Sequence, residues 1–280
     1  MTRLLLKRMA HHFFQKKLAV ICLIFILIVV LGGIFAPWLA PHDPTEVALK
    51  FKLLGPGGQF PLGTDDMGRC VFSRLLYGTR ASLGSAFVVM IIALMIGTTI
   101  GTFSAYKGGR IDNFLMRLCD IFLSFPSLVI VLVIVGVLGP GLINVMISMI
   151  LVQWLWYVRI IRSLVLSITS RSFIDAAKVA GTSDRAIIWT HILPNVLPQL
   201  IVLSTIDLGS LILHFSGYSF LGLGIQPPTP EWGMMIENGR RFIRSTPELM
   251  YYPGILITLV VISLNLIGDA LRDVFDDNYQ

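Results

Sequence analysis

Long apolar runs constrain this chain more than any other feature of its sequence. A helix that spans a bilayer needs about 20 mainly apolar residues. Six such runs occur, at residues 18–39, 82–106, 118–138, 142–161, 196–220 and 251–270. Charged residues make up only 14% of the 280 residues, too few for the surface of a soluble domain of this length. The sequence therefore predicts an all-α membrane protein with six transmembrane helices.

Basic residues predict how these helices are oriented. If the N-terminus is cytoplasmic, Arg3, Lys7 and Arg8 lie inside, together with the basic residues of the segments 107–117 and 159–185. This agrees with the positive-inside rule, and six spans return the C-terminus to the cytoplasm. A cleaved signal peptide is the alternative for the first run. That run is longer than a signal core, so we favour an uncleaved span.

The external segment at 36–80 divides the expected architecture in two. Residues 1–81 would form the first span and this segment, and residues 82–280 a five-helix core. Within the segment, Asp65 is a candidate helix N-cap and Gly78 a candidate stop. We therefore expect a short helix between them that lies along the membrane surface.

The cytoplasmic segment at 159–194 is longer than a loop that only joins two helices needs to be. Ser172 is expected to cap one short helix, which Gly181 ends in a left-handed conformation. Ser183 is expected to cap a second short helix, which Pro194 limits. Two short helices that meet at a glycine form a compact unit that we expect to bind a partner.

A polar stripe runs along the fifth apolar run. Its members recur every three or four residues and are Ser204, Asp207, Ser210, His214 and Gly217. Asp207 and His214 are two turns apart, about 10.5 Å along a helix axis, and cannot pair directly. The first four residues are our candidates for the lining of a translocation path. A buried hydrogen-bond network that holds the helices together is the alternative.

Catalytic motifs are absent from the sequence. It contains no His-Glu-x-x-His metal helix, no Gly-x-Ser-x-Gly turn and no phosphate-binding Gly-x-x-x-x-Gly-Lys-Ser/Thr loop. The three cysteines have no metal-ligand spacing, and the basic residues are not clustered with aromatic residues as in nucleic-acid binders. We therefore expect a non-catalytic chain without a cofactor, and ATP hydrolysis only by a partner.

The cytoplasmic segment carries a specific resemblance. Its motif residues are Asp175, Ala176, Ala177, Gly181, Leu193 and Pro194. The pattern resembles the Glu-Ala-Ala loop of importer permeases of the ATP-binding-cassette (ABC) class, in which this loop fits a groove in the ATPase. Asp175 replaces the usual Glu and keeps its charge, whereas His191 stands where an apolar residue is usual. The resemblance implies that this segment couples the chain to an ATPase.

Further motifs resemble the dipeptide, oligopeptide and nickel permeases of that class. They lie at residues 62–69, 219–224, 231–233 and 268–273, and Cys70 stands where those permeases usually have Asp. The resemblance implies a type I importer-permease fold in the bacterial cytoplasmic membrane. It also implies four partners: two ATPase subunits, a second homologous permease and an extracytoplasmic substrate-binding protein.

Two features favour the nickel branch of this family. They are the segment 156–165 and the occurrence of Asp207 together with Leu213 and His214 in the same apolar run. The expected substrate is therefore nickel or a chelated transition metal, with dipeptides or oligopeptides as the alternative. An ATP-independent secondary transporter is the rival from another class, which would be expected to contain internal repeats and broken helices.

Overall fold

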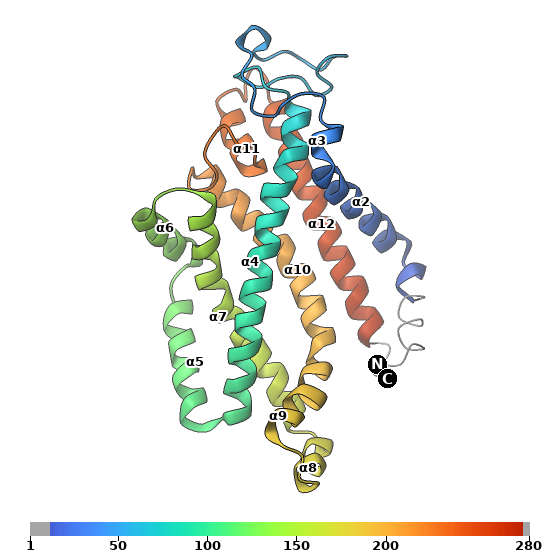
Figure 1. Ribbon diagram of the computed structural model, residues 1–280, viewed down its shortest axis with the longest axis vertical. Coiled ribbons are helices and arrows are strands. Elements are labelled where there is room, and N and C mark those ends of the chain that lie inside the picture. Colours follow the sequence, from blue (N-terminus) through green and yellow to red (C-terminus); the bar gives the residue numbers. More distant parts are fainter. Residues whose placement is uncertain (1–11, 277–280) are drawn as a thin grey trace.

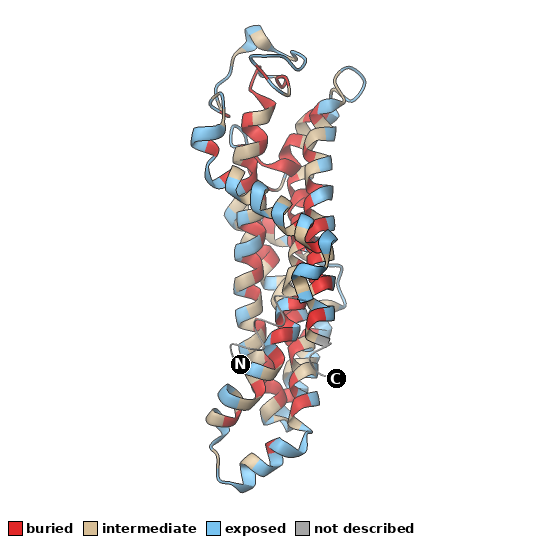
Figure 2. Ribbon diagram, turned by 90° about the vertical axis from the view of Figure 1, so that its right-hand side faces the viewer, coloured by how far each residue is buried: buried red, intermediate tan, exposed pale blue. Residues whose placement is uncertain are grey.

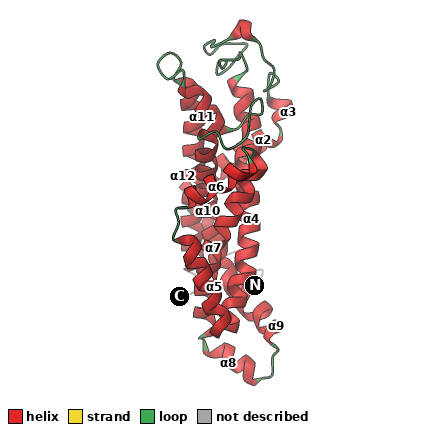
Figure 3. Ribbon diagram, turned by 90° about the vertical axis from the view of Figure 1, so that its left-hand side faces the viewer, coloured by secondary structure: helices red, strands yellow, loops and turns green. Residues whose placement is uncertain are grey.

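The computed structural model describes residues 12–276, so Arg3, Lys7 and Arg8 lie outside the described part. The long helices run along one axis and form a single elongated bundle (Figure 1). The described residues contain no β-strand, only an isolated bridge between Thr64 and Cys70 (Figure 3). The expected all-α class is confirmed.

Helices account for most of the described chain. In order they are α2 (Lys17–Ile34), α3 (Ala36–Leu39), η1 (Leu49–Phe51), α4 (Val71–Lys107), α5 (Gly109–Leu123), α6 (Ser127–Leu138), α7 (Leu142–Thr169), α8 (Ser172–Val179), α9 (Asp184–Ala186), η2 (Ile187–Ile192), α10 (Leu193–Phe220), α11 (Trp232–Arg240) and α12 (Glu248–Asp276). Five helical stretches are long and apolar enough to cross a membrane, and the pair α5–α6 would make a sixth. Exposed residues extend along the sides of the bundle and not only at its ends (Figure 2).

The third apolar run is not the continuous helix that we expected. It falls on α5 and α6, whose axes differ by 82°. The break lies at Ser124, Phe125 and Pro126. Proline has no N–H to donate and disfavours helical geometry at the residue before it, so Pro126 ends one helix and opens the next.

The second apolar run belongs to a longer helix than expected. Helix α4 begins at Val71 and continues without a break to Lys107, so the separate surface helix ending at Gly78 is wrong. Gly78 remains helical because α11 packs against it: a Cβ there would lie 2.9 Å from Cδ1 of Trp232. The proposed boundary between residues 81 and 82 falls within this helix.

Helices α4 and α7 approach each other closely through two glycines. A Cβ on Gly101 would lie 2.8 Å from the carbonyl oxygen of Val158, and one on Gly97 would overlap Cβ of Tyr157. Small residues spaced four apart allow two helix backbones to come into contact in a membrane. This contact places the α7 residues that follow Gln153 directly beside α4.

Helix α2 lies at the edge of the bundle and is fixed at both ends. Lys16, just before it, forms an ion pair with Asp273 of α12. At its other end, the Arg80 side chain donates to the carbonyl oxygens of Gly33 and Ile34, each at 2.6 Å. These carbonyls have no partner within α2 because the helix ends there. The start of α2 and the end of α12 point toward the end of the bundle that carries α8 and α9 (Figure 1).

Candidate functional site

The segment at 159–194 forms a small helical unit, α8–α9, at one end of the bundle (Figure 1). Gly181 has φ +79°, which confirms the expected left-handed turn between the two helices. The Ser183 hydroxyl accepts from the backbone N–H of Ala186 at 3.4 Å, which confirms the second cap. Ser172 is the first helical residue rather than a cap, because α8 starts one residue earlier than expected.

The second short helix does not end at Pro194. Helix α9 passes into a π-helical turn, η2, and then directly into α10, in which Pro194 is the second residue. Proline is tolerated in the first turn of a helix because an N–H there needs no partner in that helix. The Asn195 side chain also donates to the carbonyl oxygen of His191 at 2.6 Å. The expectation that Pro194 terminates the helix is therefore wrong.

The buried side of the α8–α9 unit belongs to a cluster that also contains residues of α4, α7 and α10, and part of its motif is exposed. Ile174, Ile187 and Ile192 are fully buried and hold α8 against η2. Asp175 and Ala176 are exposed, and Val179 is 90% exposed. Four of the six predicted coupling residues lie in α8 and the turn after it, whereas Leu193 and Pro194 begin α10; Ala177 and Leu193 are half-buried, and Pro194 is exposed.

The polar stripe of α10 divides into a buried residue and an open face. Asp207 is only 8% exposed. Gln153 of α7 donates to both carboxylate oxygens, at 2.9 and 3.0 Å, and the Tyr157 hydroxyl donates to one of them at 2.6 Å. Neither partner was predicted from the sequence. Their spacing of four residues, on one face of a predicted helix, was the available signal.

The rest of the stripe faces away from the chain. Ser210, His214 and Gly217 are exposed, whereas Ser204 is half-buried. His214 stacks loosely on Tyr218, with 6.4 Å between ring centres. Polar groups along a membrane helix are unfavourable against lipid. This face therefore suits contact with water or with another protein chain.

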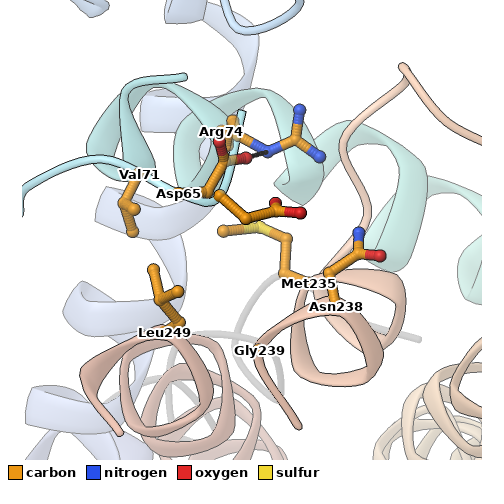
Figure 4. A pocket seen from close by; sticks show the side chains of 8 residues that line it. Asp65, Val71, Arg74, Met235, Asn238, Gly239 and Leu249 are labelled. Atoms are coloured by element: carbon orange, nitrogen blue, oxygen red, sulfur yellow. Dashed lines mark ion pairs between the residues drawn. The ribbon is translucent and has the colours of Figure 1, made fainter. Parts of the chain in front are cut away.

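The end of the bundle opposite the α8–α9 unit, which we expect to be external, holds a small cluster of charged residues (Figure 4). Asp65 accepts from the Arg69 side chain at 2.7 Å and lies 3.4 Å from Nε of Arg74. Its carboxylate also accepts from two backbone N–H groups of its own turn, so it closes a turn and is not a helix N-cap. Arg74 is buried and donates to the carbonyl oxygens of Pro44 and Pro228.

The small pocket beside this cluster has an empty volume of about 300 Å³, and Met235, Asn238 and Leu249 lie on its other side (Figure 4). The pocket therefore lies where the external segment, α4, α11 and α12 meet.

Glu231 is a further residue of interest at this end of the bundle, and it was not predicted from the sequence. Its side chain caps α11 by accepting from the N–H groups of Gly233 and Met234, and Ser82 of α4 donates to it at 2.9 Å. The residue is fully buried, and this burial raises the pKa of its carboxyl group. Glu231 therefore joins the external loop to α4.

No group of three or more His, Cys, Asp or Glu side chains in the described part of the chain is arranged to hold a metal ion. The structure thus has an exposed helical unit at one end of the bundle, an open polar face along α10 and a tightly packed cap at the other end.

Comparison with known proteins identifies this arrangement. Residues 97–280 match the family described as binding-protein-dependent transport system inner membrane component. The chain belongs to this family. Residues 5–56 also match the N-terminal TM domain of oligopeptide transport permease C. Membership excludes the rival of an ATP-independent secondary transporter.

Two curated relatives cover almost the whole chain. The nickel transport system permease protein NikC of Escherichia coli (strain K12) is 42% identical over 91% of this chain and 92% of its own length. The dipeptide transport system permease protein DppC of Alkalihalophilus pseudofirmus is 43% identical over 94% of this chain and 86% of its own.

A solved structure supports the fold. The MetNI methionine ABC transporter, in an inward-facing conformation, contains a chain that matches with a TM-score of 0.56 and 24% identity. The match covers 70% of this chain and 94% of the other. The protein is thus a multi-pass, non-catalytic inner-membrane permease subunit with the ABC importer fold.

Proposed function

We propose that this permease pairs with a second, homologous permease and forms half of a path for nickel or a chelated transition metal. Two ATPase subunits bind on the cytoplasmic side, and an extracytoplasmic binding protein delivers the substrate to the external cap. Both termini lie in the cytoplasm in this proposal. Transport then follows alternating access, driven by ATP hydrolysis in the partner subunits.

The proposed coupling to an ATPase is based on the structure of the α8–α9 unit. Its three buried isoleucines pack in a cluster with residues of α4, α7 and α10, whereas Asp175, Ala176 and Val179 are exposed. A rigid unit that exposes small and apolar side chains is suited to docking in a groove of another protein. Tyr106 of α4 donates to Asp184 at 2.7 Å, so movement of the docked unit would reach a long membrane helix directly.

The proposal of a metal substrate is based on the polar groups of α7 and α10. Asp207 forms no ion pair with a lysine or arginine among the described residues, and its hydrogen-bond donors, Gln153 and Tyr157, are neutral. A carboxylate without a counter-ion attracts cationic solutes to the adjoining face. Dipeptides remain the second candidate, because DppC is as similar to this chain as NikC is.

Purification of the complex through a tag on this chain tests the proposal. We expect an ATPase and a second permease to copurify, and vesicles that contain the complex and its binding protein to accumulate nickel only with ATP. The isolated chain is expected to show no ATPase activity. If the vesicles take up a dipeptide but not nickel, the substrate is a peptide and the proposed metal substrate is wrong. A tagged chain that copurifies with no ATPase would contradict the assignment of α8–α9.

A further inference from the structure

We propose that Gln153 is a substrate-contacting residue of the path, which presents its side-chain oxygen to a cationic cargo while Asp207 holds the amide in that orientation. This inference rests on the proposed function of the α10 face and names a residue of that face on α7.

The orientation of the Gln153 amide follows from its partner. The amide turns its NH₂ group toward Asp207, because both of its hydrogen bonds to that carboxyl group are donated by the nitrogen. The two contacts, at 2.9 and 3.0 Å, join Nε2 to both carboxylate oxygens. Tyr157 approaches the same carboxylate from one turn further along α7. The other end of the amide, Oε1, therefore points away from Asp207.

The amide oxygen is accessible and has no partner in the described chain. Gln153 is half-buried, and the structure gives hydrogen bonds only to its nitrogen. Its oxygen is also not among the buried side-chain atoms that lack a partner, which belong to His42, Thr102, Ser216 and Ser219. Oε1 consequently lies at the surface of the chain, near the middle of a helix that is long enough to cross the membrane.

An accessible amide oxygen at this depth needs a polar environment. Lipid offers no hydrogen-bond donor, so polar groups inside membranes face other protein groups or a water-filled cavity. The neighbouring helix α10 also carries polar groups that need a polar environment, because Ser210 and His214, which follow Asp207, are exposed. Gln153 thus continues onto α7 the polar face that begins on α10.

This arrangement suits positively charged cargo. The neutral oxygen can accept from a metal-bound water or an ammonium group, and oxygen ligands of this kind bind cations without holding them tightly. The Asp207 carboxylate lies behind it, shielded from direct contact, and contributes a negative field. A cation could therefore pause at Gln153 without being trapped by a bare carboxylate.

The first test is uptake of Ni²⁺ by the complete importer in vesicles, compared between wild type and Gln153→Met. Methionine is similar in length but cannot accept strongly, so we expect KM for Ni²⁺ to rise about tenfold with the amount of assembled complex retained. The ratio of Ni²⁺ to Co²⁺ uptake should also change, because a residue that touches the cargo affects different ions differently. Ser148→Ala is the matched control, since that α7 hydroxyl is buried and bonded to Asn144.

A second variant separates substrate contact from support of Asp207. Gln153→Lys keeps a donor for the carboxylate but removes the acceptor and adds a positive charge. We expect this complex to assemble at wild-type levels and to lose Ni²⁺ uptake. If both variants have the wild-type KM and the wild-type ion ratio per assembled complex, the inference is overturned. Gln153 would then only donate to Asp207 as a structural residue. If the wild type transports a dipeptide and not Ni²⁺, the proposed metal substrate fails, and KM for the dipeptide decides the role of Gln153.

Discussion

Gly181 occupies a backbone conformation that a β-branched residue adopts only with strain. Its φ of +79° lies in the left-handed region, and nothing within 4 Å would block a Cβ, so conformation rather than space requires the glycine. Gly181→Val is expected to cost about 1–2 kcal/mol locally, to weaken ATPase binding and to abolish transport. The measurement is the amount of ATPase captured on a tagged chain, together with uptake.

Gly181→Asn is the matched control, because asparagine tolerates left-handed geometry better than other non-glycine residues. It should retain more bound ATPase than Gly181→Val. Wild-type capture and uptake in the valine variant would contradict the coupling role of this turn.

Glu231 gives the external cap a dependence on pH. Burial raises the pKa of its carboxyl group above the usual 4.5, so folding favours the protonated form. Stabilisation from this residue is fully present below the unfolded-state pKa and is lost as pH rises through the folded-state pKa. The thermal midpoint of the purified complex should therefore fall less between pH 5 and pH 8 in Glu231→Gln than in the wild type. Identical pH profiles would show that Glu231 does not titrate in this range.

Sequence alone could place the polar residues of α10 but not their roles. Periodicity put Asp207 and His214 on one stripe, since the helical repeat is fixed by backbone geometry. The structure buries the first and exposes the second, because α7 supplies donors only at the level of Asp207. Which helix lies opposite a residue is a tertiary property, and no local pattern encodes it.

Helix α5 is attached to α7 through two ion pairs of different strength. Arg162 forms a two-point contact with Asp112, with both distances 2.5 Å, and Ser104 of α4 donates to the same carboxylate. Arg159 pairs with Asp120 at 3.4 Å, and both side chains are more than half exposed. The first pair therefore joins three helices, whereas the second lies at the surface.

Arg162→Ala is expected to destabilise the complex by about 1–3 kcal/mol, because it leaves the largely buried Asp112 without its charged partner. Arg159→Ala, the matched control, should cost less than about 1 kcal/mol. Denaturation of the purified complex measures both. If exchanging Asp112 and Arg162 restores stability, the pairing itself is responsible. Equal losses in the two alanine variants would contradict a special role for the Asp112 pair.

Element boundaries were harder to predict than elements. Hydropathy located every long apolar stretch, because lipid demands it over the whole length of a span. The ends depended on neighbours: Trp232 packs on Gly78 and lets α4 continue through a glycine, and η2 lets α10 continue through Pro194. The turn at Gly181 and the cap at Ser183, by contrast, were predicted correctly, because they depend on the local chemistry of glycine and serine.

The orientation of the whole molecule can be tested by labelling. The native cysteines Cys22, Cys70 and Cys119 are buried and would be replaced by serine. Thr229 and Ser183 are both exposed and precede α11 and α9, helices that lie toward opposite ends of the bundle (Figure 1), so single cysteines there are open to reagent. In intact cells, an impermeant thiol reagent is expected to modify Thr229→Cys and to spare Ser183→Cys. After permeabilisation both should react, and the reverse pattern in intact cells would invert the proposed topology.

In helix α4, the number of residues between contact points matters for the fold as much as the type of residue does. Its 37 residues extend about 55 Å. Near one end Ser82 meets Glu231, and further along Gly97 meets Tyr157. Deleting one residue between these points would turn one half against the other by about 100° and shift it by about 1.5 Å. Ser82 and Gly97 could then no longer both reach their partners. This stretch should therefore tolerate many exchanges of one apolar residue for another, but not a single insertion or deletion.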